Sequence, residues 1–127
     1  MDLSLPARLF VGITLVLACF SASALGDERQ NAAKEQVAFG IEVARIGLWR
    51  EAIYRWEKAV ELDPKNASAR NNLAVAYEQS GAFDQANEEY ERALELDADN
   101  LYIRQNYELF REAYERKKRT DRRANRN

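Results

Sequence analysis

The sequence contains no histidine and a single cysteine, Cys19, among its 127 residues. One cysteine cannot build a disulfide framework within the chain, and the lack of histidine excludes Ser-His triads, Cys-His pairs and imidazole metal sites. The charged and apolar fractions, 31% and 46%, are those of a globular protein with long helices. Only carboxylates, amines, guanidiniums and hydroxyls are left for chemistry, so we expect no enzyme, no cofactor and no metal site.

The start of the chain has a stretch without charge, Leu9–Phe20. Arg8 and the amino terminus precede it, and Ala22 and Ala24 follow it in the A-x-A arrangement of a signal-peptidase site. Its twelve residues are fewer than the ~20 that cross a bilayer. We therefore expect residues 1–24 to be a secretory signal peptide. The mature chain would then lack cysteine, which suits a secreted or periplasmic protein.

Two other interpretations of the leader stay open. Leu9–Leu25 is nearly long enough to form an uncleaved membrane anchor if its two serines are tolerated. The tetrapeptide that ends at Cys19, "VLAC", resembles the lipobox of bacterial lipoproteins, although Leu17 and Phe20 fit that motif poorly. We expect membrane contact only under one of these two interpretations.

After the leader, apolar residues recur at steps of three and four, which predicts α-helices and an all-α fold. Gly47 and Gly81 fall where a helix should end in a left-handed residue. Pro64 should stop the second helix, and Asn66 and Asn100 are placed to cap the third and the fifth. No alternating run long enough for a strand follows the leader.

One pattern of residue types occurs twice in the chain, at an interval of 34 residues. "FGIEVARIGLWREAIYRWEKAVELDP" begins at Phe39, and "LAVAYEQSGAFDQANEEYERALELDA" begins at Leu73. The positions shared by the two units are Phe39, Gly40, Val43, Gly47, Trp49, Ala52, Trp56 and Ala59 in the first, and Leu73, Ala74, Tyr77, Gly81, Phe83, Ala86, Tyr90 and Ala93 in the second. This interval and these positions resemble the tetratricopeptide repeat (TPR) family.

The resemblance implies pairs of antiparallel helices that stack into a short solenoid. Residues 25–32 would be a linker or helix lead-in, 33–66 and 67–100 the two repeats, 101–119 a partial third repeat, and 120–127 a disordered basic tail. Because one pair cannot bury its apolar face alone, neighbouring units share a core. We expect Trp49, Trp56, Tyr77, Phe83 and Tyr90 to fill that core. The cap over the second repeat should come from Leu101, Ile103, Tyr107, Phe110 and Tyr114.

Charge divides the chain unevenly. Residues 27–115 carry 11 basic and 19 acidic side chains, a net charge of −8, and we expect most acids of the second repeat on a solvated surface. Residues 116–127 carry 7 basic and 1 acidic, a net charge of +6. Cations favour the carboxyl end of a helix, so a solvated tail is the plain interpretation. The other is attachment to anionic lipid or another polyanion, but the leader argues against nucleic acid.

In TPR proteins the first helix of each unit lines a concave groove. By register, this groove would be lined by Lys34, Val37, Ile41 and Arg45, then by Asn71, Asn72, Val75 and Glu78, and then by Tyr102, Gln105 and Asn106. Members that grip a partner's terminal carboxylate use Lys, Asn and Arg at set places, and only Asn72 matches one of them. The resemblance therefore implies a groove for an extended segment or a helix of a partner.

These observations predict a small exported bacterial TPR protein that serves as an interaction scaffold or adaptor for another protein, with self-association possible. One alternative is a structural, self-assembling subunit of an envelope complex. Another is an exported enzyme that uses only carboxylates, for which no nucleophile and base can be paired.

The leader gives the first testable prediction. Because Ala22 and Ala24 follow an apolar run too short to span a bilayer, the protein isolated from its native host should begin at Leu25. Intact-mass measurement decides the question. A mass that includes residues 1–24 would instead support the anchor, and a diacylglyceryl adduct on Cys19 would support the lipoprotein.

Overall fold

The structure, a computed structural model, describes the backbone of residues 8–126 and the side chains of residues 22–126. Five helices account for most of it: α1 (Arg8–Arg45), α2 (Trp49–Leu62), α3 (Ala67–Gln79), α4 (Phe83–Leu96) and α5 (Leu101–Ala124). No strand occurs within the described residues, so the predicted all-α class is confirmed. Most of the leader's side chains, including Cys19, lie outside the described part, and its processing stays a prediction. Among the described residues, no helix combines the length and apolarity needed to cross a membrane.

The helices end at the predicted glycines and begin at the predicted asparagine caps. Gly47 and Gly81 have φ angles of 81° and 79°, the left-handed region that glycine enters without a steric cost. The side chain of Asn66 accepts a hydrogen bond from the backbone nitrogen of Ala69 at 2.9 Å. The side chain of Asn100 caps α5 in the same way at 3.3 Å. Each cap satisfies a backbone donor that a helix start leaves unpaired.

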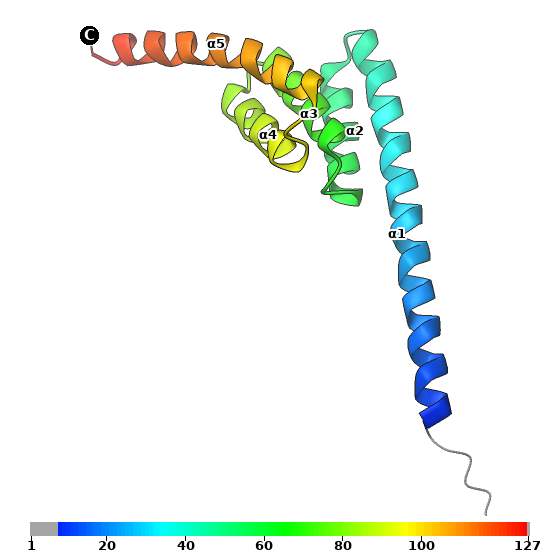
Figure 1. The fold of residues 1–127 in the computed structure, drawn as a ribbon. Helices are drawn as coiled ribbons and strands as arrows, with labels where there is room; N and C mark the ends of the chain where they lie inside the picture. Colours follow the sequence, from blue (N-terminus) through cyan, green and yellow to red (C-terminus); the bar gives the residue numbers. More distant parts are fainter. Residues whose placement is uncertain (1–7, 127) are drawn as a thin grey trace, which may run out of the picture.

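Helices α1 to α4 pack as two successive hairpins, and α5 lies against the second one (Figure 1). Helix α1 is longer than its partner, so its first part runs beyond the packed body while its second part lies beside α2. Among the described side chains of α1, burial begins at Ala33, and residues 22–31 are exposed. The carboxyl end of α5 also projects beyond the body. The two helices that exceed the repeat length therefore extend away from the shared core.

The first core lies between α1, α2 and α3, around Trp56. A Cβ atom built on Gly40 would lie 2.4 Å from the indole nitrogen of Trp56, so only glycine lets the ring sit here. That nitrogen donates a hydrogen bond to the backbone oxygen of Val37 at 3.2 Å. Leu73 of α3 belongs to the same cluster, which joins the first repeat to the second. Trp56 is thus a core residue as predicted, whereas Trp49 is only half-buried at the edge.

The second core is aromatic and joins α4 to α5. Phe110 has no exposed surface, and its ring centroid lies 5.1 Å from that of Tyr90 and 5.3 Å from that of Tyr114. Phe83 stacks on Phe110 at 6.0 Å. These separations are those of favourable aromatic pairs. Helix α5 therefore packs over the second repeat as predicted.

Tyrosine hydroxyls connect successive helices above these cores. Tyr77 of α3 donates to Glu57 of α2 at 2.6 Å, and Tyr90 of α4 donates to Glu78 of α3 at 3.1 Å. Two hydroxyls of α5 continue the series toward α4: Tyr107 donates to Glu91 at 3.3 Å, and Tyr114 donates to Asp84 at 2.6 Å. A hydrogen bond to a charged acceptor is stronger than one between neutral groups, so the rings are held in position as well as buried.

One acid of the second repeat departs from the expected solvated surface. Glu89 pairs with Arg70 at 2.8 Å, and both side chains are almost fully buried. Arg70 also donates from Nε to the backbone oxygen of Pro64 at 3.0 Å. This pair joins α3, α4 and the turn before α3. Removing one partner of such a buried pair leaves an uncompensated charge.

Two expectations for α5 need correction. The tail of residues 120–127 was expected to be disordered, yet the helix continues to Ala124. Thr120 donates to the backbone oxygen of Arg116, and Lys117 pairs with Asp121, both at the i to i+4 spacing that supports helix. Leu101 was expected in the cap but is 62% exposed, because the first residue of α5 lies on the side away from α4.

The aromatic core gives a stability prediction. Replacing Phe110 with Ala should lower the free energy of unfolding by about 3–5 kcal/mol, since it opens a cavity where no atom is exposed. Leu109→Ala is the matched control at the neighbouring position. The Leu109 side chain is 72% exposed, so its loss should cost about 0.5 kcal/mol or less. Urea denaturation followed by circular dichroism measures both. Equal losses would show that α5 is not held by this core.

Candidate partner-binding surface

The predicted groove residues lie on α1, α3 and α5, the first helices of the three units. The structure divides them by burial. Asn71 is buried, and Val37, Asn72, Val75, Glu78 and Asn106 are half-buried. The exposed members are Lys34, Ile41, Arg45, Tyr102 and Gln105. A partner can therefore reach the side chains of this last set more fully than the others.

Two amides of the predicted groove hold the fold together. The side-chain nitrogen of Asn106 donates to the side-chain oxygen of Asn71 at 3.1 Å, which fastens α5 to α3. Asn71 is 9% exposed, so little of it is left for a peptide backbone. Asn71, predicted to line the groove, therefore has a structural contact between α3 and α5. Asn72, the next residue, makes no side-chain hydrogen bond within residues 22–126 and is the amide of this pair that a partner can reach.

Three further members also have internal partners. The carboxylate of Glu78 accepts the Tyr90 hydroxyl. Val37 packs on the first core, and Val75 packs on the second. Because these three side chains are half-buried, a partner would contact only their exposed parts.

The most exposed apolar side chains of α5 are Tyr102 and Leu109, at 79% and 72%. Seven residues separate them, which is two helical turns, so both lie on one side of α5 together with Gln105. Leu109 was missed by the register of the repeat, since the third unit departs from the family pattern there. The signal that could have found it is the helical step from Tyr102 and Gln105. The apolar surface of α5 is therefore larger than the sequence predicts.

A second apolar surface lies at the turn between α1 and α2, outside the predicted groove. An open hollow of about 940 Å³ is lined there by Phe39, Val43, Gly47, Leu48, Trp49, Arg50 and Glu51. Ile46 and Leu48 at its edge are 71% and 52% exposed. Sequence reasoning assigned these residues to a helix end and a turn, because exposure cannot be read from their type.

The acids near the groove serve the tyrosine contacts. Burial, followed by the neighbouring carboxylates, raises the pKa of Tyr77 and Tyr90 above the usual 10.0. Burial and the nearby Glu91 raise the pKa of Tyr107 in the same direction. These hydroxyls therefore stay protonated at neutral pH and continue to donate. The arrangement supports packing, and within the described residues no group of metal-binding side chains accompanies it.

Stacked antiparallel helix pairs with shared cores define an α-helical repeat protein. Comparison with family models narrows the class. Residues 46–81 match a model described as TPR repeat, and residues 67–100 match one described as tetratricopeptide repeat. Together with the fold, these matches support a TPR family protein. TPR domains bind other proteins or peptides.

Solved structures share this fold. The TPR domain of Arabidopsis OM64 aligns with a TM-score of 0.65 at 23% identity, over 71% of this chain and 74% of its own. MamA aligns at 0.62 and 24% identity, over 65% of this chain and 48% of its own, and a mutant of MamA aligns at 0.59 and 21%, over 91% and 88%. Identities this low show likeness of fold alone. No curated protein matches the sequence.

The amide pair gives the prediction of this section. Asn106→Ala removes the donor to Asn71 and leaves a buried carbonyl oxygen unpaired, which should cost about 1–3 kcal/mol of unfolding free energy. Asn72→Ala is the control and should be neutral or slightly stabilising, since alanine is the better helix former. Thermal and urea denaturation compare the two. If Asn106→Ala is as stable as the control, Asn71 returns to the set of groove residues.

Proposed function

We propose that this protein is an exported interaction scaffold whose first helices hold an apolar segment of a partner protein. The observation that carries the proposal is the exposure of Tyr102 and Leu109 on one side of α5. Large apolar side chains that gather on the surface of a small protein mark interaction sites, and tyrosine is enriched where partners bind. Ile41 of α1 and Asn72 of α3 add exposed apolar and amide groups on the other first helices.

The spacing of Tyr102 and Leu109 indicates the length of the partner segment that can contact both. Seven residues of helix rise about 10 Å, which two turns of a partner helix or about three residues of an extended strand also cover. The net charge of −8 over residues 27–115 favours a segment that carries basic residues, because long-range attraction speeds its encounter. The groove lacks the Lys and Arg that would favour a terminal carboxylate. We therefore propose an internal, apolar and basic segment as the ligand. The proposal that the protein is exported depends on the interpretation of residues 1–24 as a signal peptide.

A second candidate function is self-assembly, and the apolar hollow beside α2 favours it. Ile46 and Leu48 are exposed at the turn between α1 and α2, beside this hollow. A second copy that packs on this turn would bury both side chains. Light scattering of the purified protein over a range of concentrations tests this candidate, with Ile46→Gln as the variant that should weaken association. A monomer at all concentrations would remove it.

The groove is tested with peptides of known sequence. A phage-displayed peptide library is selected on the wild-type protein, and the affinities of the selected peptides are measured by fluorescence anisotropy. Tyr102→Gln/Leu109→Gln should weaken binding at least tenfold, because each apolar contact removed is worth about 1 kcal/mol or more.

The control variant is Tyr54→Gln. Tyr54 is also an exposed aromatic residue, but it lies on α2, a second helix. This variant should bind the selected peptides like the wild type, and circular dichroism should show retained helix in both variants. Peptides that bind the folded double variant with unchanged affinity would refute the groove as the site.

A further inference from the structure

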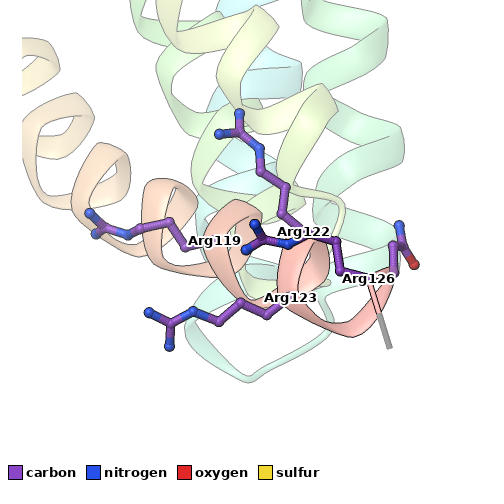
Figure 2. Close-up of a pocket in the computed structure, with 5 residues that line it drawn as sticks. Arg119, Arg122, Arg123 and Arg126 are labelled. Atoms are coloured by element: carbon purple, nitrogen blue, oxygen red, sulfur yellow. The ribbon is translucent and has the colours of Figure 1, made fainter.

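The helical extension of α5 arranges the basic tail. Four arginines lie near its end: Arg119, Arg122 and Arg123 belong to the helix, and Arg126 lies in the turn two residues after Ala124, the last residue of α5. At about 100° per residue, the spacing of the three helical arginines confines their Cα–Cβ directions to a sector of roughly 100°. Figure 2 shows their side chains reaching out from the end of α5, with Arg119 and Arg123 extended to the same side. They line an open hollow of about 550 Å³ together with Asn125. We call these four residues the arginine face.

Two lysines of the tail, Lys117 and Lys118, have contacts within the fold. Lys117 pairs with Asp121 at 2.8 Å, and its ammonium lies 6.0 Å from the centre of the Phe83 ring. The ammonium of Lys118 lies 4.1 Å from the centre of the Tyr114 ring. Within residues 22–126, no guanidinium of the arginine face forms an ion pair. The two lysines thus have partners in the fold, and the arginines are left for a partner outside it.

We infer that the arginine face docks on an anionic phospholipid surface. The guanidinium is planar and offers two parallel N–H donors, which match the oxygens of a phosphate. Several such groups on one side of a rigid helix can contact neighbouring headgroups at once. A disordered tail would have to order these groups on binding, whereas the helix presents them already aligned.

The composition of the segment favours lipid over a protein partner. Residues 115–126 contain no large apolar or aromatic side chain. Protein interfaces depend on a central apolar or aromatic cluster, which this segment cannot supply. A phosphate-rich surface needs only charge and hydrogen bonds. The uncharged run Leu9–Phe20 favours lipid over nucleic acid, since an exported chain leaves the compartment that holds nucleic acid.

The position of the arginine face keeps the acidic repeats away from an anionic surface. About 15 Å of helix lies between Tyr114, the last buried residue of α5, and Ala124, where the helix ends. The screening length at physiological salt is about 8 Å. The acidic repeats can therefore stay more than one screening length from an anionic surface while the tip of α5 contacts it. Glu112 and Glu115, nearer the body, set the inner limit of the basic segment.

The test measures binding of the full chain to vesicles. Protein expressed with its leader, and isolated as the cell leaves it, is sedimented with vesicles of phosphatidylcholine alone or with about 30% phosphatidylglycerol as the probe, which gives the surface a negative potential. The wild type should bind the anionic vesicles more strongly, and added salt should weaken this preference. Arg119→Gln/Arg123→Gln should lower the partition coefficient about 25-fold, at about fivefold per basic residue.

Lys117→Gln/Lys118→Gln is the matched control, because it removes the same charge from lysines of the same segment that have contacts within the fold. It should lower the partition coefficient less than fivefold. In case a retained leader binds every vesicle, a polarity-sensitive dye on Asn125→Cys, in a Cys19→Ser background, reports contact at the tail itself. Its emission should shift with anionic vesicles and stay unchanged with neutral ones.

Three results would overturn the inference. Equal losses in the two double variants would mean that net charge acts without a defined face. No preference for anionic vesicles at 0.1 M salt, a roughly physiological screening, would mean that the face does not bind lipid. Release of the protein from vesicles by an equal phosphate concentration of RNA would identify nucleic acid as the better ligand. The arginine variant should keep the peptide affinity of the wild type, which separates this inference from the groove.

Discussion

The burial of Phe110 among the rings of α4 and α5 is the contact on which both proposed surfaces depend. Its ring has no exposed surface and lies within about 6 Å of the rings of Tyr90, Tyr114 and Phe83. Because a helix is rigid, fixing one side of α5 fixes the directions of all its other side chains. Tyr102, Leu109 and the arginine face keep their places relative to the repeats for this reason.

Helix α5 combines three kinds of surface along its length. Its inner side supplies the aromatic core, and one outer side near its start presents Tyr102 and Leu109. The end of the same helix presents the arginine face, beyond the reach of the repeats. A chain with two repeats has few surfaces to offer, and a helix longer than the repeat provides additional ones without a further fold. The proposed scaffold could thus hold a partner in the groove while the tip of α5 rests on lipid.

Two kinds of contact join the helices: close packing, and hydrogen bonds to charged carboxylates. Glycine at position 40 admits the indole ring of Trp56, and that ring connects α1 to α2 and α3. Between later helices, tyrosine hydroxyls reach the acids of the preceding helix. Some of the acids that the sequence predicts on a solvated surface therefore hold neighbouring helices together. The buried pair of Arg70 and Glu89 is the strongest case, since its two charges have little contact with water.

The sequence by itself determined the helices, their limits and the repeat. Those features depend on neighbours in the chain: the apolar period of a helix, glycine at a left-handed turn, an asparagine cap, and a pattern that returns after 34 residues. Only the tertiary structure decided which groove residues are free. Asn71 is buried because Asn106, 35 residues later, lies against it. Leu109 is exposed because the packing of Phe110 turns it outward. Burial and pairing depend on residues distant in sequence, which no local pattern records.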